Sequence, residues 1–144
     1  MNQYKKILIA IDGSGAAKKG FEKGLSIAKA NDAKLILTHV IDTRTFATAE
    51  AYDRSIVERA NKYAHELIEE YEQAAKEAGI TNVEKCIEYG SPKVKIPKDI
   101  AKEQQVDLII CGATGLNAVE RFLIGSVSES ITRYASCDVL VVRE

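Results

Sequence analysis

Residues 106–128 read VDLIICGATGLNAVERFLIGSVS, and this stretch decides the fold. Its first part, Val106 to Cys111, is an apolar run with the length and composition of a buried strand. The run ends in glycines, and helical spacing resumes at Ser126 and continues to Ala135. A strand that leads through glycines into a helix frees backbone amides, which can hold an anion. The stretch therefore predicts a parallel α/β sheet with an anion site beyond a strand's carboxyl end.

The glycines of this stretch have a regular spacing. Two residues separate Gly112 from Gly115, and Gly125 follows after nine more, directly before Ser126. The residues from 111 to 128 contain no lysine, and Arg121 is their only cation. We therefore expect backbone amides and hydroxyl groups to make most of the contacts with any phosphate bound here.

Apolar runs alternate with helical spacing along the rest of the chain. The other predicted strands are Ile7 to Ile11, Lys34 to Val40, an edge strand from Val83 to Tyr89, and Cys137 to Val142. The predicted helices cover Ala17 to Ala28, Ser55 to Ala78, a segment that Pro97 opens, and Ser126 to Ala135. Thr43 to Asp53 lacks periodicity, and we expect a loop or a short helix there.

This alternation predicts a three-layer α/β/α sandwich around a five-stranded parallel sheet of Rossmann-like type, with strand order 3-2-1-4-5. In such sheets ligands bind beyond the carboxyl ends of the strands, where the strand order reverses. Asp12 follows the first predicted strand and Gly112 follows the fourth. We expect the carboxylate and the glycines to share one crevice.

Length and composition predict one domain spanning residues 1–144. Lys and Arg number 20 against 21 Asp and Glu, so no excess charge favours nucleic acid or a membrane surface as a partner. The three cysteines form no CxxC pair, and the amino-terminal apolar run is too short for a secretory signal. We expect a cytoplasmic protein with a small-molecule partner.

Several segments resemble the universal stress protein family, in particular its ATP-binding branch. The resemblance covers nearly the whole chain and lies in the motifs KKILIAIDGS (5–14), LILTHV (35–40), GSP (90–92), VDLIICG (106–112), GATG (112–115), GSVSESI (125–131) and CDVLVV (137–142). The glycine spacing matches the pattern that distinguishes nucleotide binders in this family. The chain departs from the family between Lys93 and Pro97, where it carries one more residue and a second proline, which leaves the start of the following helix open.

The resemblance implies an adenine nucleotide alpha hydrolase-like fold and ATP, or another adenine nucleotide, as cofactor, with or without Mg or Mn. Asp12 and the backbone of Val40 would then contact the adenine. Ala10 and Ile11 would line the floor near the ribose, with Gly112 close by. The phosphates would meet the amides of Gly115, Gly125, Ser126 and Val127 and the hydroxyls of Ser126 and Ser128.

Each site residue also has a purely structural interpretation. Gly112 could form a turn at a strand end, Gly125 and Ser126 could cap a helix, and Asp12 could cap the helix that follows it. His39 is expected to be a packed, hydrogen-bonded core residue. We find neither a Ser, His and acid set nor a GxxxxGK[ST] signature, so the sequence favours a binder over an enzyme.

The favoured interpretation is an ATP-binding stress-response sensor that acts as a regulatory dimer. The last predicted strand would leave Val139 to Val142 at a sheet edge, and a twofold homodimer would cover it. The family resemblance implies the same dimer. Two alternatives stay open, an ATP-independent dimeric interaction module and a slow ATPase.

Overall fold

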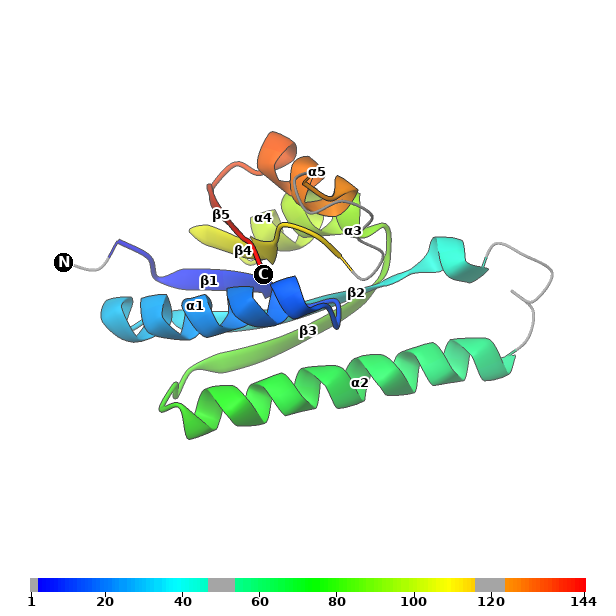
Figure 1. The fold of residues 1–144 in the computed structure, drawn as a ribbon, viewed down its shortest axis with the longest axis horizontal. Coiled ribbons are helices and arrows are strands. Elements are labelled where there is room, and N and C mark those ends of the chain that lie inside the picture. The colour runs from blue at the N-terminus through cyan, green and yellow to red at the C-terminus, as the bar shows by residue number, and fades with distance from the viewer. Residues whose placement is uncertain (1–2, 47–53, 116–123) are drawn as a thin grey trace.

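Five parallel strands form the centre of the protein (Figure 1). The structure is a computed structural model that describes residues 3–46, 54–115 and 124–144. The strands are β1 (Lys6–Ala10), β2 (Lys34–Asp42), β3 (Val83–Gly90), β4 (Leu108–Gly112) and β5 (Asp138–Val142). Their order is β3-β2-β1-β4-β5, which confirms the predicted topology. The order reverses between β1 and β4, which pair directly from Ile7 opposite Leu108 to Ile9 opposite Ile110.

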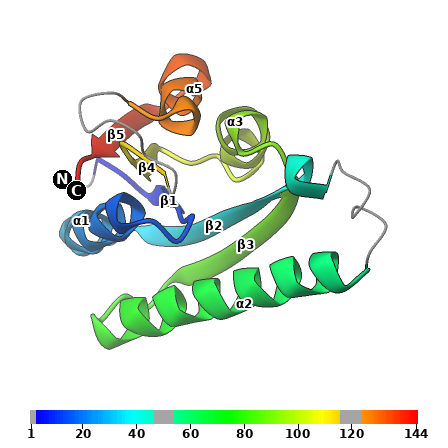
Figure 2. The ribbon, with the colours of Figure 1, turned by 45° about the vertical axis from the view of Figure 1, so that its right-hand side comes forward.

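Helices cover both faces of the sheet (Figure 2). One face packs against α1 (Gly15–Asn31) and α2 (Arg54–Glu77), and the other packs against α3 (Pro92–Val94), a π-helical turn η3 (Lys95–Ile100), α4 (Ala101–Glu103) and α5 (Ser126–Tyr134). A short 3-10 helix, η1 (Thr43–Phe46), follows β2. The helices thus form the outer two layers of the predicted sandwich.

Alternate residues of the central strands enter separate cores. Ile7 and Ile9 of β1 pack with α1 and α2, whereas Leu8 between them packs with the helices of the opposite face. All three side chains are fully buried. A strand buried on both faces reads as a continuous apolar run, which is why these strands are visible in the sequence.

The helix after β3 begins earlier than the sequence predicts. We expected Pro97 to open it, but α3 begins at Pro92, and Pro97 lies buried inside the π-helical turn η3. Proline has no amide hydrogen to donate, so it fits both at the first position of a helix and inside a wider π-helical turn. The prediction was wrong because it assigned Pro97 to the first of these positions.

The buried stripe of α2 differs from the predicted one by about one position. The apolar spacing in the sequence predicts a stripe through Ile56, Ala60, Ala64, Leu67, Tyr71, Ala74 and Ala78, whereas the fully buried residues are Ala64, Ile68 and Ala75. Tyr71 still packs at the side of this stripe, where its ring contacts Phe21 of α1 edge to face with 4.7 Å between centroids. The buried face is therefore wider than a single line of residues.

Three helical segments end in the same hydrogen-bonding motif. The residue after the helix takes a left-handed conformation, at Asp32 (φ 52°), Gly79 (φ 93°) and Gln105 (φ 56°). The amide of the next residue then donates to the carbonyl five residues back, as in Ile80 N–H to Ala75 O (3.0 Å) and Val106 N–H to Ala101 O (3.0 Å). This is the Schellman arrangement, and it satisfies carbonyl groups that the helix end leaves open.

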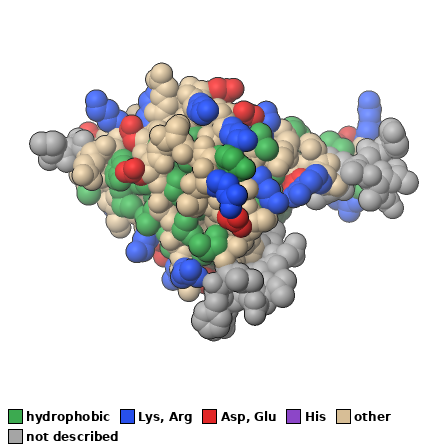
Figure 3. All heavy atoms as spheres, turned by 90° about the horizontal axis from the view of Figure 1, so that it is seen from above, with side chains coloured by type: hydrophobic (Ala, Val, Ile, Leu, Met, Phe, Trp, Pro, Cys, Tyr) green, Lys and Arg blue, Asp and Glu red, His purple; other side chains and the backbone are tan. Residues whose placement is uncertain are grey.

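The face that carries α5 and the helical segment from Pro92 to Glu103 shows lysines, arginines and acidic residues interspersed with apolar side chains (Figure 3). On this face Lys98 lies over the ring of Tyr134, 4.2 Å from its centroid. Within the described ranges of the chain, no helix is long and apolar enough to cross a membrane.

Candidate functional site

The ends of β1 and β2 are tied together directly beyond the sheet. The amide of Ile11 donates to the carbonyl of Thr38 at 2.8 Å, and the ring Nδ1 of His39 lies 2.7 Å from the carbonyl of Ile11. Because a carbonyl only accepts, Nδ1 carries the proton in this contact. His39 is thus a hydrogen-bonded, half-buried residue, as its position in an apolar strand predicts.

The backbone of Val40 faces the space past the end of β1. Thr38 pairs with Ala10, the last residue of β1, and its carbonyl points toward that strand. In a strand, polar groups two residues apart point to the same side, so the N–H and C=O of Val40 point beyond Ala10. The Val40 side chain is buried at 7% exposure in the opposite-face core. The N–H and C=O of Val40 therefore lie on the β1 side of β2, beyond the last residue of β1.

Asp12 lies between the end of β1 and the turn into α1. Its Oδ1 accepts the amide of Ser14 at 2.9 Å, and Ser14 Oγ in turn accepts the amide of Ala17 at 3.1 Å. The helix cap is therefore Ser14, and Asp12 shapes the turn before it. The second oxygen, Oδ2, lies 3.5 Å from the place that a Cβ would take on Gly115. The structure thus places the Asp12 carboxylate next to Gly115.

Gly112, at the end of β4, lies against the first turn of α1. A Cβ on Gly112 would lie 2.7 Å from the carbonyl carbon of Ala16 and 2.8 Å from the amide nitrogen of Ala17. Close packing of α1 against β4 therefore requires glycine here, a role that differs from the ribose contact expected from the sequence.

Ala113 to Gly115 form the β4 exit, which meets the start of α5. Gly125 donates its amide to the carbonyl of Ala113 at 2.6 Å, and Ala113 donates its own amide to Val142 at 2.7 Å. A Cβ on Gly125 would lie 3.7 Å from the amide nitrogen of Gly115. The two glycines, which nine residues separate in the sequence, are thus neighbours.

The first turn of α5 lacks a side-chain cap. Gly125 is the N-cap residue, so no hydroxyl or carboxylate of the cap fills the end of the helix. Ser126 is exposed and Val127 is half-buried. In the part of the chain that the structure describes, no hydrogen bond is recorded for the Ser126 hydroxyl. A helix start with open amides and a free hydroxyl suits an anion.

Ser128 differs from Ser126 in its surroundings. It is 3% exposed, and its Oγ lies 3.0 Å from the carbonyl oxygen of Ala113 and 3.0 Å from that of Gly125. Both partners accept, so the hydroxyl donates its proton to them.

Two further predicted site residues lie at the end of β1. Ala10 is half-buried at the end of β1, and Ile11 is 2% exposed. Arg121, the one cation expected in the glycine stretch, lies outside the described residues, as do residues 47–53 of the expected loop. Sequence reasoning missed Ala113, because an alanine carbonyl that accepts two hydrogen bonds has no sequence signature.

Cys111 lies one residue before the glycines and is buried at 4% exposure. Burial, and then the negative charge of Asp12, raise the pKa of the Cys111 thiol to about 12. The thiol therefore stays protonated and unreactive at neutral pH.

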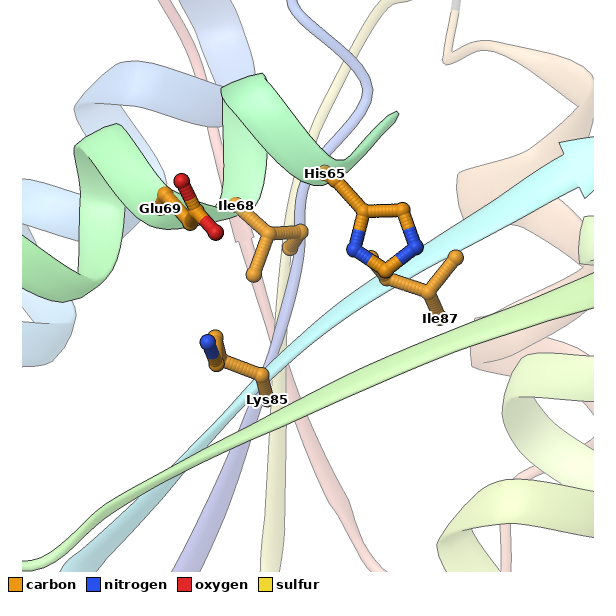
Figure 4. Close-up of a pocket in the computed structure, with 5 residues that line it drawn as sticks. All are labelled: His65, Ile68, Glu69, Lys85 and Ile87. Atoms are coloured by element: carbon orange, nitrogen blue, oxygen red, sulfur yellow. The ribbon is translucent and has the colours of Figure 1, made fainter. Parts of the chain in front are cut away.

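A separate hollow of about 280 Å³ lies between α2 and β3 (Figure 4). Ile68 and Ile87 form its apolar part, while His65, Glu69 and Lys85 border it. None of the sequence-predicted site residues lines it. Lys85 forms an ion pair with Glu72 of α2 at 3.5 Å, so the hollow lies where α2 packs against β3.

The fold defines a class: a Rossmann-like α/β protein in which Asp12, the β4 exit and the start of α5 meet where the strand order reverses. The profile of the Universal stress protein family matches residues 3–143, and the chain belongs to that family.

Individual relatives agree with this assignment. The chain is 54% identical over 143 residues to a protein of Staphylococcus haemolyticus named as a universal stress protein, covering 99% of this chain and 87% of the relative. The solved structure of the universal stress protein UspA from Lactobacillus plantarum superposes with a TM-score of 0.88 at 31% identity, covering 99% of this chain and 100% of that one. A universal stress protein solved in complex with cAMP gives a TM-score of 0.73 at 27% identity, covering 99% and 98% of the two chains.

Proposed function

We propose that this chain binds an adenine nucleotide, with ATP as the favoured ligand, and acts as a nucleotide-dependent stress-response sensor in the form of a regulatory homodimer. One observation carries the proposal: Asp12 Oδ2 lies 3.5 Å from the Cβ position of Gly115, so an acceptor and the glycine loop border the same space. Among the residues that the structure describes, and apart from the chain neighbours of Gly115, no other heavy atom lies within 4 Å of that position.

The adenine would lie past the end of β1. Its exocyclic amine would donate to the Asp12 carboxylate, and its ring edge would pair with the outward N–H and C=O of Val40. Ala10 and Ile11 would form the floor near the ribose, and the backbone of Gly112 would lie close to it. The contact between His39 and Ile11 supports this arrangement because it fixes the residue directly before Asp12.

The phosphates would lie between the β4 exit and α5. The amides of Gly115, Ser126 and Val127, together with the Ser126 hydroxyl, would supply donors at a helix N-terminus, where the dipole also favours an anion. The Gly125 amide, which the sequence also suggested as a donor, already donates to the carbonyl of Ala113 at 2.6 Å. Mg²⁺ or Mn²⁺ would neutralise part of the phosphate charge. Within the described residues, no group of three or more His, Cys, Asp or Glu could hold a metal by itself, so the nucleotide would bring the ion.

The relative in complex with cAMP supports an adenine nucleotide as ligand, since its 27% identity extends over 99% of this chain. We also propose that residues 1–144 form one domain, which the continuous sheet supports, and that the protein is cytoplasmic, with neither nucleic acid nor membrane as partner. The near balance of 20 basic and 21 acidic residues supports the last point.

The homodimer would form through Val139 to Val142. In the described part of the chain, β5 is an edge of the sheet, with β4 as its neighbour on one side. An uncovered edge with valine and leucine side chains pairs readily with a second copy.

The test is direct measurement of ligand. We expect nucleotide to be released when the purified protein is precipitated with acid, and calorimetry to detect both ATP and adenosine. Gly115→Val should abolish ATP binding while leaving the thermal melt unchanged, because the side chain would fill open space. Absence of co-purified nucleotide together with no heat at millimolar ATP would refute the proposal. Multiple turnovers of ATP would instead favour an enzyme.

A further inference from the structure

We propose that Ser128 is a positioning residue of the nucleotide site: its buried hydroxyl holds the β4 exit against the first turn of α5 and does not contact the phosphates. This inference rests on the proposed function for its effect on ligand binding. We call the two contacts of Ser128 Oγ, to the carbonyls of Ala113 and Gly125, the Ser128 clasp.

The clasp holds Ala113, a residue whose backbone carbonyl and amide are both hydrogen-bonded. The carbonyl of Ala113 accepts from Ser128 Oγ at 3.0 Å and from the amide of Gly125 at 2.6 Å. The amide of Ala113 donates to Val142 of β5 at 2.7 Å. The β4 exit is thereby joined to the sheet on one side and to α5 on the other.

These hydrogen bonds fix the distance between the proposed phosphate donors of the β4 exit and those of α5. Gly125 lies so close to the β4 exit that a Cβ on it would be 3.3 Å from the Ala113 carbonyl oxygen and 3.7 Å from the Gly115 nitrogen. The amide of Gly115 and the first amides of α5 therefore border one small region. If the clasp opens, these two sets of donors can move apart, and a phosphate can no longer reach both.

The single proton of the Ser128 hydroxyl distinguishes a positioning role from direct contact with a phosphate. A serine hydroxyl has one proton, and a carbonyl oxygen and a phosphate oxygen both require a donor. Ser128 is 3% exposed and already donates to carbonyls, whereas Ser126, two residues earlier, is exposed. Ser126 is thus the hydroxyl that can reach a ligand, and Ser128 is the one that holds the frame.

The test compares Ser128→Ala with Ser126→Ala, which is the same deletion on the same helical turn. In the ligand-free protein, we expect Ser128→Ala to speed amide hydrogen exchange of Gly125 by about tenfold, since a clasp bond of ordinary strength is lost. Ser126→Ala should leave that exchange unchanged. Calorimetry should show ATP affinity falling about tenfold in Ser128→Ala, with adenosine affinity within about twofold of the wild type. Ser128→Thr, which keeps the hydroxyl, should restore both values.

Two results would overturn the inference. One is unchanged Gly125 exchange in Ser128→Ala, whether or not ATP affinity falls, because a direct phosphate contact would weaken ATP binding without altering the ligand-free protein. The other is an equal loss of ATP and adenosine affinity, which would mean general disruption. Failure of the proposed function looks different, since the wild type would then bind no adenine nucleotide. The exchange comparison would still support or overturn the clasp in that case.

Discussion

Gly112 of β4 lies in direct contact with Ala16 of α1, so close that a Cβ on Gly112 would be 2.7 Å from both the carbonyl carbon and the Cβ of Ala16. Backbone cannot yield as the end of a flexible side chain can. The first turn of α1, which begins next to Asp12, is therefore positioned by the absence of a side chain on β4. For Gly115, three residues later, the nearest described atom outside its chain neighbours is Oδ2 of Asp12, 3.5 Å from the Cβ position.

Gly112→Ala should destabilise the protein by about 1 to 3 kcal/mol, because overpacking forces α1 away from the sheet. Gly115→Ala is the matched control and should change the unfolding free energy by less than about 1 kcal/mol, since its Cβ makes only an ordinary contact. Urea unfolding of the two variants beside the wild type measures both values. Equal stabilities for the two variants would contradict the packing role of Gly112.

Asp12→Asn should weaken adenosine binding by about tenfold or more, because the new amide presents a donor where the adenine amine needs an acceptor. Asp42→Asn is the control, since Asp42 also lies at the carboxyl end of a strand but pairs with Arg44 at 2.7 Å. Calorimetry with adenosine compares the two without involving phosphates. Unchanged affinity in Asp12→Asn would remove Asp12 from the adenine site.

The sequence predicts the sheet well because the information is local. Strands buried on both faces, such as Ile7 to Ile11, appear as continuous apolar runs, and right-handed crossovers leave few possible strand orders. The helix after β3 was mispredicted because Pro97 reads as a helix start, whereas the structure absorbs it in a π-helical turn after Pro92. A turn with a wider hydrogen-bonding pattern has no distinctive residue type.

The closeness of Asp12 and Gly115 could be predicted from the sequence, whereas the backbone contacts around them could not. Asp12 and Gly115 do meet, and that meeting follows from the strand order. The roles of the Ala113 carbonyl and of the contact between Gly112 and Ala16 depend on tertiary distances that no single position encodes. Ser128 and Ser126 are the same residue type on one turn, and only burial separates their roles.

The helix-ending motifs predict that removing a glycine and introducing one have opposite effects on stability. Gly79→Ala should lower stability by about 1 kcal/mol, because φ at this position is 93° and a Cβ is disfavoured there. Gln105→Gly should raise stability by up to about 1 kcal/mol, because Gln105 takes the same role with φ at 56°. Thermal or urea unfolding compares the two. A loss of stability in Gln105→Gly would mean that its side chain contributes contacts that outweigh the backbone strain.

Stability should fall at alkaline pH partly through Cys111. Burial and the charge of Asp12 raise the pKa of this thiol from 9.0 to about 12, so the folded state keeps its proton after the unfolded chain has lost it. The contribution is therefore fully present below pH 9.0 and declines as pH rises toward about 12. Urea unfolding at pH 8 and pH 10 (roughly one unit either side of the free thiol pKa) should show a shallower decline for Cys111→Ala than for the wild type. Parallel declines would show that Cys111 does not titrate as expected.

The proposed dimer edge can be tested with two prolines at adjacent positions. The carbonyl of Val142 accepts the amide of Ala113 at 2.7 Å, so the polar groups of Val142 point toward β4. Alternation along the strand then directs the amide of Val141 to the uncovered side, where proline is tolerated within a protomer. Val141→Pro should therefore weaken dimerisation with little loss of protomer stability, whereas Val142→Pro should lower stability because it removes an amide facing β4. Sedimentation at micromolar concentration and urea unfolding measure the two effects. A monomeric wild type would refute the dimer. A Val141→Pro protein that still sediments as a dimer would place the interface elsewhere.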